Sequence, residues 1–495
     1  MNYQYQCMNY YLRALMKTAF NHFVLTILLL LLCQSAFSAA NDLPDMGSSS
    51  NRVLPLNLEQ ELGDNYMRII RRELDINSDP LIRTYINQLG FRLVAASPDA
   101  EDRQFYFFVV NDPVVNAFAM PGGYIGINSG LIKQAKSEDE LAGVIAHEIA
   151  HVTQRHIARR IEQQQQLSLP SMLALLGSIL IMTQDGEAGM AAMTGLQAGA
   201  QQVMINHTRA NESEADRVGI TTLANAGFNP TGMTRFFEKM LQLSRYSGQR
   251  LAFLSTHPLS QRRITESRER ARKLSFIEQI DNDTFRLMQQ RLMGTMNQDF
   301  NALNRDYEKY LSNVRADRIS DELRYGQAVI QFRLGNVTQA LEQLTPLFDK
   351  DPENPVYLVT MAEVLTTLGR GNEALEILQS PLDFNPGNDA YTIAYAKALV
   401  SLDKTKDALD LLYEHLPKLD KEPFMYQLIA DVQSKHGLYK EVHESTGLYL
   451  YHSGDLQGAL AQFKLAISGR SDDPYFNARL SARIRKVQKE ILLLK

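Results

Sequence analysis

The stretch "VIAHEIAHVTQRH" at residues 144–156 contains three histidines and one glutamate, and its centre has the pattern H-E-x-x-H. Residues four apart project from one face of an α-helix, so His147 and His151 can reach the same metal ion. Glu148 stands beside the first of them, where its carboxylate can deprotonate a water molecule without binding the metal itself. Imidazoles combined with a carboxylate favour zinc. The stretch therefore predicts a helix that carries two ligands and the general base of a catalytic zinc site.

The flanking residues predict where this helix begins and ends. Ser137 and Glu140 form an S-x-x-E capping box, so the helix is expected to begin directly after the serine. It is then expected to run through the motif to the glutamine tract at 163–166. On such a continuous helix, His156 lies five residues beyond His151 and is turned away from the metal. We therefore expect His156 to be a bystander.

Two strands and two helices are predicted upstream of the motif. The segments "FYFFVV" (105–110) and "GGYIGINSGLI" (122–132) are predicted strands, separated by the turn-rich "NDPVVNAFAMP" (111–121). Residues 58–93 have apolar positions at helical spacing, and "NSDP" at 77–80 divides them into two helices. The first part of the chain is thus predicted to be mainly helical with a small sheet.

A catalytic zinc site also needs a third protein ligand and an open position for water. The metzincin pattern places a glycine three residues after the second histidine and another histidine three residues later. This chain has Gln154 and Ile157 at those two positions. The metzincin class is therefore excluded.

The segment "NESEADRVGI" (211–220) contains the stronger candidates for the third ligand. Glu212 and Asp216 lie four residues apart and so on one face of a helix. One of them can bind zinc while the other accepts the second N–H of a ligating histidine. His207 is an alternative ligand, and Glu214, on a different face, is expected to be a solvated surface acid.

An internal repeat follows residue 300. Ala340, Ala374 and Ala408 recur at intervals of 34 residues within similar segments. A 34-residue period of paired helices is typical of tetratricopeptide repeats. The next position in phase is Val442, and Ala459 follows only half a period later, which predicts one extra single helix. The sequence therefore predicts a helical solenoid, an architecture that usually presents a concave surface to a peptide or protein.

The beginning of the chain has the pattern of an export signal. The apolar run "FVLTILLLLL" (23–32) follows two basic residues and precedes "SAFSAA", whose small residues suit cleavage after Ala40. We expect a signal peptide over 1–40, a linker over 41–55 and a periplasmic location. The apolar segment at 171–182, like the first run, is shorter than the roughly 20 residues that span a bilayer. It is expected to form helices packed on the catalytic domain, with a lid or membrane-dipping loop as the alternative.

Composition narrows the class of protein further. The formal net charge of -5 over 495 residues is small, so nothing in the overall charge favours nucleic-acid binding. Both cysteines, Cys7 and Cys33, belong to the predicted signal peptide. The exported chain would therefore contain no disulfide, even in an oxidising compartment.

Taken together, four motifs carry a resemblance to a known family. They are "NAFAMPGG" (116–123), "HEIAH" (147–151), "NESEAD" (211–216) and "THPLSQRRI" (256–264). The chain resembles the HtpX-like and CAAX-prenyl-protease-like gluzincin metallopeptidases, and within them the secreted bacterial branch with a tetratricopeptide tail. The resemblance implies a mainly α architecture: an α+β zincin-type metallopeptidase domain with a small sheet over 56–290, then an α-helical tetratricopeptide repeat solenoid over 300–495.

The resemblance also implies the ligands and catalytic groups. His147, His151 and Glu212 would bind one Zn²⁺ per chain, and Glu148 would be the general base. Asp216 would orient one of the ligands.

The H-P-x-x-x-x-R element of the family matches His257 and Arg263. The resemblance implies that both lie near the substrate carbonyl, where they can stabilise an oxyanion. His257 can instead occupy the fourth zinc position at rest, or merely cap the next helix. In the family, residues 116–123 lead into an edge strand beside the cleft, and the backbone of 119–127 is expected to hold the substrate as an added strand.

The function implied by the resemblance is that of a periplasmic zinc-dependent endopeptidase with chaperone-like activity. It would act in quality control and assembly of outer-membrane β-barrel proteins. Its partners would be misassembled outer-membrane proteins and, through the repeats, the β-barrel assembly machinery, with peripheral membrane contact and no nucleic acid. The long apolar helices of the membrane-embedded branches are missing after residue 40, which disfavours prenylated substrates.

The alternative is a repeat-based chaperone or adaptor whose zinc site is structural or largely silent. Glu148 argues against a purely structural site, because a closed zinc site has no use for a general base.

Overall fold

The computed structural model describes residues 53–101, 103–163, 209–247, 252–276, 283–296, 299–315, 318–468 and 473–493. Residues 56–495 form one compact unit, distinct from residues 1–55. The predicted signal peptide, the linker up to residue 52, the apolar segment 171–182 and His207 lie outside the described residues. Within the described ranges, no helix is both long enough and apolar enough to cross a membrane.

A three-stranded sheet lies at the centre of the first part of this unit. The strands are β1 (Tyr106–Val110), β2 (Ala117–Ala119) and β3 (Tyr124–Asn128), with a 3-10 turn, η1 (Pro121–Gly123), between the last two. Their order is β1-β3-β2, with β3 parallel to β1 and antiparallel to β2. The central strand is therefore paired on both sides, and β2 lies at the edge.

Two expectations about the strands are wrong in part. The predicted strand over 122–132 ends at Asn128, because α5 (Ser129–Gln134) begins there. The predicted substrate-holding backbone over 119–127 consists mostly of η1 and the doubly paired β3. Among these segments, only β2 has an edge that can accept an added strand.

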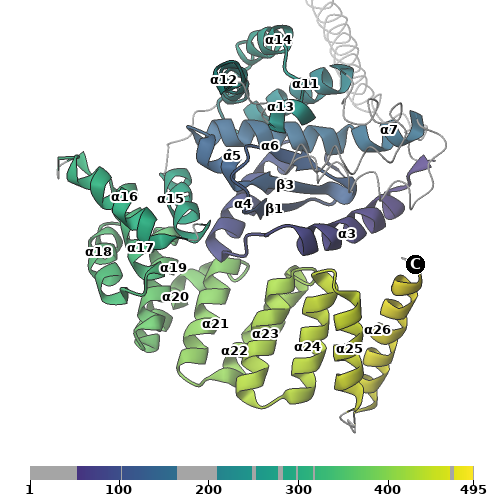
Figure 1. Ribbon diagram of the computed structural model, residues 1–495, viewed down its shortest axis with the longest axis vertical. Helices are drawn as coiled ribbons and strands as arrows, with labels where there is room; N and C mark the ends of the chain where they lie inside the picture. The colour runs from purple at the N-terminus through teal and green to yellow at the C-terminus, as the bar shows by residue number, and fades with distance from the viewer. Residues whose placement is uncertain are drawn as a thin grey trace, which may run out of the picture. The chain divides into compact units, whose positions relative to one another are not determined.

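The sheet is covered on both faces, as Figure 1 shows. Strand side chains alternate between faces. On one face, Phe107 and Val109 join a hydrophobic cluster with α4 (Pro80–Ala95) and α6 (Glu138–Thr153). On the other, Phe108 and Val110 pack against α3 (Leu56–Glu73). The two predicted upstream helices thus cover opposite faces of the sheet.

Helix α6, which carries the H-E-x-x-H motif, begins as the capping box predicts. The Ser137 side chain accepts a hydrogen bond from the backbone N–H of Glu140. The helix ends at Thr153, so the predicted continuous helix to residue 163 is wrong. Arg155 adopts a left-handed φ of 52°, and a new helix, α7 (His156–Gln163), begins directly after it. The Arg155 guanidinium lies 3.0 Å from the buried Glu59 carboxylate, so this side chain is fixed on the α3 side of the reversal.

Four helices pack over α6 on the side away from the sheet. They are α11 (Arg209–Asn225), α12 (Thr231–Ser247), α13 (Ala252–Thr256) and α14 (Gln261–Ala271). Two of the glycines that permit close approach are Gly143 and Gly219. A Cβ atom on Gly143 would lie 2.8 Å from the Met233 backbone of α12, and one on Gly219 would lie 3.1 Å from the Ala146 backbone of α6. This close packing brings α11 against the motif helix.

The remaining described helices form the repeat array (Figure 1). Two helices lead into it, α15 (Thr284–Met296) and α16 (Phe300–Ser312). The array itself consists of α17 (Asp321–Arg333), α18 (Val337–Lys350), α19 (Pro355–Thr367), α20 (Gly371–Phe384), α21 (Asp389–Ser401), α22 (Thr405–His415), the 3-10 turn η3 (Leu416–Lys418), α23 (Pro423–His436), α24 (Tyr439–His452), α25 (Leu456–Ser468) and α26 (Pro474–Leu493).

The predicted period is confirmed by this array. Ala340, Ala374 and Ala408 are fully buried at equivalent places in α18, α20 and α22. The extra single helix is wrong in number, because Ala459 belongs to α25 and a second helix, α26, follows it. One hydrophobic cluster runs from α4 and α6 through α15 and into α21, so the repeats share a core with the first domain.

Candidate metal centre

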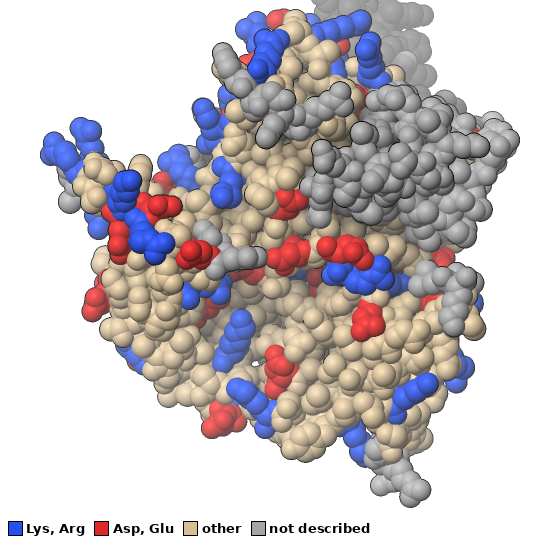
Figure 2. Space-filling model, viewed as in Figure 1, with Lys and Arg blue, Asp and Glu red and all other residues tan. Residues whose placement is uncertain are grey.

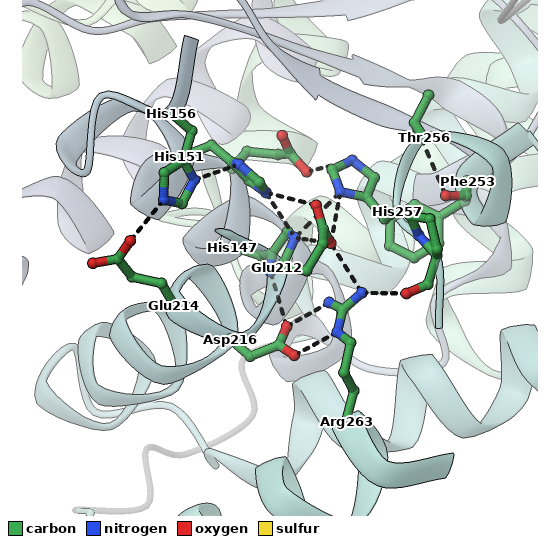
Figure 3. Close-up of polar contacts among 12 residues, drawn as sticks. His147, His151, His156, Glu212, Glu214, Asp216, Phe253, Thr256, His257 and Arg263 are labelled. Carbon is green, nitrogen blue, oxygen red and sulfur yellow. Dashed lines mark hydrogen bonds and ion pairs between the residues drawn. The ribbon is translucent and has the colours of Figure 1, made fainter. Parts of the chain in front are cut away.

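Four buried side chains from three segments converge at one point (Figure 3). They are His147 and His151 of α6, Glu212 of α11 and His257, which follows α13. One ligand atom from each lies within 4.8 Å of the others, and each residue is at most 2% exposed. Local helix geometry explains the first pair, and the close packing of α11 on α6 brings in Glu212.

The spacing of these atoms suits one tetrahedral ion. Zinc bonds of roughly 2.1 Å place neighbouring ligand atoms about 3.4 Å apart. His147 Nε2 lies 3.1 Å from His151 Nε2 and 3.5 Å from Glu212 Oε2, and His151 Nε2 lies 3.5 Å from Glu212 Oε1. The residues present therefore fit zinc.

His257 contacts both the metal-binding cluster and the predicted base. Its Nδ1 atom lies 3.3 Å from His147 Nε2 and 3.4 Å from Glu212 Oε2, which is the fourth corner of the tetrahedron. Its Nε2 atom lies 3.3 Å from Glu148 Oε1. The ring also packs on Phe253, with ring centres 5.1 Å apart. In this arrangement His257 covers the position that a water molecule needs.

The electrostatics of the cluster favour a bound cation. Burial would raise the pKa of Glu212, but the neighbouring His257 and His147 hold it well below its usual range. Burial opposes protonation of His147, yet hydrogen bonds to Asp216 and Glu212 raise its pKa to about 10. The cluster thus stabilises positive charge strongly. Burial raises the pKa of Glu148, which suits a general base working near neutral pH.

Asp216 and Arg263 hold two of the predicted zinc ligands, His147 and Glu212, in place. Asp216 Oδ1 lies 3.1 Å from His147 Nδ1, the nitrogen that does not face the cluster. Arg263 Nε and Nη2 each donate to Asp216 at 2.8 Å. Its Nη1 lies 2.9 Å from Glu212 Oε2 and donates to the carbonyl of Pro258 at 2.7 Å. These contacts favour a positioning role for Arg263 over the predicted contact with an oxyanion.

His156 and Glu214 form a second support that the sequence reasoning missed. His156 Nδ1 lies 2.9 Å from His151 Nδ1, and His156 Nε2 lies 3.1 Å from Glu214 Oε2 (Figure 3). Arg159 Nη1 donates to the same carboxylate at 2.9 Å. Burial lowers the pKa of His156, so a neutral ring can accept from His151 and donate to Glu214. The expectation of a bystander histidine is therefore wrong. Glu214 is partly exposed, as expected for a surface acid, but it is paired with His156 and Arg159.

No local sequence signal predicts the contact between His156 and His151. His156 reaches His151 only because the chain reverses at Arg155, and neither Gly nor Pro marks that break. The nearest clue in the sequence is that each of the two motifs contains one more candidate polar residue than the metal needs. These residues are His156 in the opening stretch and Glu214 in "NESEAD".

The edge strand β2 lies beside the predicted base. The backbone N–H of Ala119 donates a hydrogen bond to Glu148, which lowers the pKa that burial raises. Asn116, just before β2, lies 3.4 Å from the Thr256 hydroxyl, next to His257. A strand added to the edge of β2 would therefore pass Glu148 and the metal-binding cluster.

Comparison with known proteins agrees with this geometry. Residues 80–271 match peptidase family M48, and residues 331–391 match the tetratricopeptide repeat. A beta-barrel assembly-enhancing protease from Escherichia coli (strain K12) is 39% identical over 322 residues, which are 65% of this chain and 65% of that protein. One from Yersinia pestis is 37% identical over 333 residues, 67% of this chain and 68% of its own length.

A more distant relative matches a shorter part of the chain. The mitochondrial metalloendopeptidase OMA1 of Schizosaccharomyces pombe is 32% identical over 185 residues, 37% of this chain and 52% of that protein. The zinc of this family fits the buried cluster of three histidines and a glutamate. The chain belongs to peptidase family M48, with tetratricopeptide repeats after its peptidase domain.

Proposed function

We propose that the chain is a zinc endopeptidase in which His147, His151 and Glu212 hold the metal. The observation that carries this proposal is the position of Glu148: it is 1% exposed and contacts both the edge strand β2 and the residue at the fourth corner of the cluster. When bound, zinc supplies Lewis-acid chemistry, because it lowers the pKa of water and polarises a peptide carbonyl.

The chain's own residues supply the rest of the reaction. A substrate strand pairs with the edge of β2 and so lies beside Glu148. Glu148 accepts the proton of the attacking water and delivers it to the leaving amine. Asp216 and Arg263 keep His147 and Glu212 in place throughout. Asp216 holds the ring nitrogen of His147 that does not face the cluster, and Arg263 pairs with both Asp216 and Glu212.

We propose that the observed position of His257 is a resting state. Its two ring nitrogens approach the metal-binding cluster and Glu148 together, and so obstruct both water and base. Replacement of this ring, in His257→Ala, is expected to raise the rate of proteolysis several-fold. A lower rate would instead assign His257 to stabilisation of the transition state. The assay is cleavage of an unfolded protein substrate by variants of equal zinc content.

The proposed substrates are misassembled outer-membrane β-barrel proteins, and the proposed location is the periplasm. Support comes from the names of the relatives, which are called beta-barrel assembly-enhancing proteases. We further propose that the repeats contact the β-barrel assembly machinery. Their shared core with the peptidase domain would keep a bound client close to the metal centre.

The experiment that tests the proposed function is the change Glu148→Gln. Loss of the base is expected to reduce degradation of the client by a factor of about 100 or more, while zinc stays bound. Degradation and assembly of the same β-barrel client are measured side by side. If degradation survives, the proteolytic mechanism is wrong. If assembly survives while degradation is lost, the repeat array also works as a chaperone on its own.

A further inference from the structure

A cavity of about 320 Å³ lies between α3 and the last helices of the repeat array. Five basic side chains line it: Arg68 and Arg71 from α3, Lys421 from the turn before α23, and Arg483 and Lys486 from α26. Its only acidic lining residues among the described ones are Asp64 and Asp420. Basic side chains thus outnumber acidic ones in the lining of this cavity, in a chain whose net charge is -5. Figure 2 shows charged side chains gathered along this boundary between α3 and the repeats.

Several of these cations already have partners. Arg68 lies 3.2 Å from Glu490, Arg71 lies 3.3 Å from Glu422, and Lys421 lies 3.0 Å from Asp64. Arg483 lies 3.2 Å from Glu444. These ion pairs join the helices that form the walls of the cavity and so maintain its shape.

Lys486 is different from the other four. It is exposed, its ammonium lies 5.1 Å from the centre of the Tyr451 ring, and no described carboxylate lies within 4.0 Å of it. A cation held over an aromatic face at the rim can receive an anionic ligand without losing an existing ion pair.

A neutral histidine belongs to the polar part of the cavity wall. His452 lies in the lining, stacked on Tyr426 with ring centres 5.3 Å apart and an interplanar angle of 2°. Burial, followed by the charges of Arg71, Arg68 and Lys486, lowers the pKa of His452 to about 3. The neutral ring can donate an N–H to an incoming anion.

The other walls are apolar. Leu448, Phe463 and Val487 line the cavity beside the ring of Tyr451. Pockets for small ligands span roughly 300–1,000 Å³, and this cavity lies at the small end of that range. It has room for the end of a chain rather than for a long segment. A ligand that suits it therefore combines one negative charge with one apolar side chain.

We propose that this cavity binds the C-terminal carboxylate of a polypeptide whose last residue is apolar. The carboxylate lies by Lys486 and His452, and the terminal side chain packs between Leu448 and Val487. A polypeptide is favoured over a membrane lipid because the cavity is closed by a repeat array, a scaffold suited to polypeptide ligands. This site shares no residue with the metal centre. It therefore goes beyond the proposed peptidase activity: it would select protein ligands by their free C-terminus.

The experiment compares two fluorescent eight-residue peptides that end in phenylalanine, one with a free carboxylate and one with a C-terminal amide. Binding is measured by fluorescence anisotropy to the full chain carrying Glu148→Gln, so that cleavage plays no part. The free acid is expected to bind at least tenfold more tightly. Equal affinity for the two peptides would overturn the proposal, whether or not the chain is an active peptidase.

Variants of α26 locate the binding. Lys486→Glu is expected to weaken binding of the free acid by about tenfold, which corresponds to about 1.4 kcal/mol. Lys489→Glu is the control: it makes the same charge change on an exposed residue of the same helix that does not line the cavity. An equal loss in both variants would mean that general charge, not the cavity, attracts the peptide, and would sink the idea.

Two further measurements complete the test. Leu448→Trp narrows the apolar wall and is expected to abolish binding of the free acid while zinc content stays unchanged. Vesicles of anionic phospholipid are tested against vesicles of neutral phospholipid. Lys486-dependent binding to anionic vesicles without binding of the peptide would overturn the proposal in favour of a lipid site.

Discussion

At the scale of single residues, the metal centre depends on which group holds the second nitrogen of each histidine. Asp216 holds His147, and His156 holds His151. These contacts fix the tautomer and the ring orientation that a ligating histidine needs. Removal of such a partner costs metal affinity even though the ligand itself remains.

The change His156→Ala is therefore expected to weaken zinc binding by a factor of about 10–100. Zinc retention is measured by elemental analysis after dialysis against a graded series of chelator concentrations. Glu212→Ala provides the reference for loss of a ligand.

The matched control for this prediction is His415→Ala. His415 is a buried histidine that bonds Asp389 at 2.8 Å within the repeats, away from the metal centre. Unchanged zinc affinity in His156→Ala, or an equal effect of His415→Ala, would show that the contact with His151 does not support the ligand.

At the scale of elements, the site depends on how closely α12 and α11 approach α6. Gly143 faces the backbone of Met233, and Gly219 faces the backbone of Ala146. The second contact sets the distance between α11, which carries Glu212 and Asp216, and α6, which carries the two histidines. Backbone atoms cannot move aside as a flexible side chain can, so added volume here must separate helices.

The change Gly143→Ala is expected to destabilise the fold by about 1–3 kcal/mol, the usual cost of overpacking. Its Cβ would lie 2.8 Å from the Met233 backbone. The free energy of unfolding is measured by urea titration followed by circular dichroism. Gly387→Ala is the control, because its Cβ would meet only the flexible side chains of Lys418 and Asn385. A change of the same size in both variants would contradict this packing argument.

At the scale of the whole described unit, ion pairs between buried and partly buried side chains join the peptidase domain to the repeats. Arg291 of α15 lies 2.8 Å from Asp79, at the start of α4, and 3.0 Å from Glu363 of α19. Glu422, before α23, lies 2.9 Å from Arg83 of α4 and 3.3 Å from Arg71 of α3. The residues of each pair are far apart in the sequence, so each pair joins two distant segments of the chain. An ion pair requires one relative position of the two segments, whereas apolar contacts tolerate several.

The junction at Glu422 predicts a dependence of stability on pH. Burial would raise the pKa of Glu422, but Arg83 and Arg71 hold it below the usual 4.5. A carboxylate with a lowered pKa in the folded state stabilises the fold above its unfolded pKa and loses that contribution as pH falls further. Replacement by the neutral Glu422→Gln is expected to cost about 2 kcal/mol at pH 7.

This prediction is checked by urea unfolding at pH values from 7 down to 3.5. The difference between the wild type and Glu422→Gln is expected to be constant above pH 5 and to shrink below about 4.5. Glu373→Gln is the control, because Glu373 pairs with Arg370 on the surface of a single helix. A difference that stays constant down to pH 3.5 would refute the assigned role of Glu422.

The sequence by itself determined the start of α6, the repeat period and the local half of the site. Regular backbone geometry turns a spacing of four residues into one helix face, so His147 and His151 were predictable as a pair, and a 34-residue period predicted the solenoid. Ser137 marked the start of α6 because a cap acts within one turn.

Only the tertiary structure decided the rest, because it depends on segments that meet across long distances in the chain. From spacing alone, Glu212 and Asp216 were equivalent; the packing of α11 on α6 directs one toward the cluster and the other toward His147 Nδ1. The reversal at Arg155 is held by Glu59, almost a hundred residues earlier, so no local pattern could place His156 beside His151. Periodicity is a property of neighbouring residues, whereas the partners of a buried polar group are set by the whole fold.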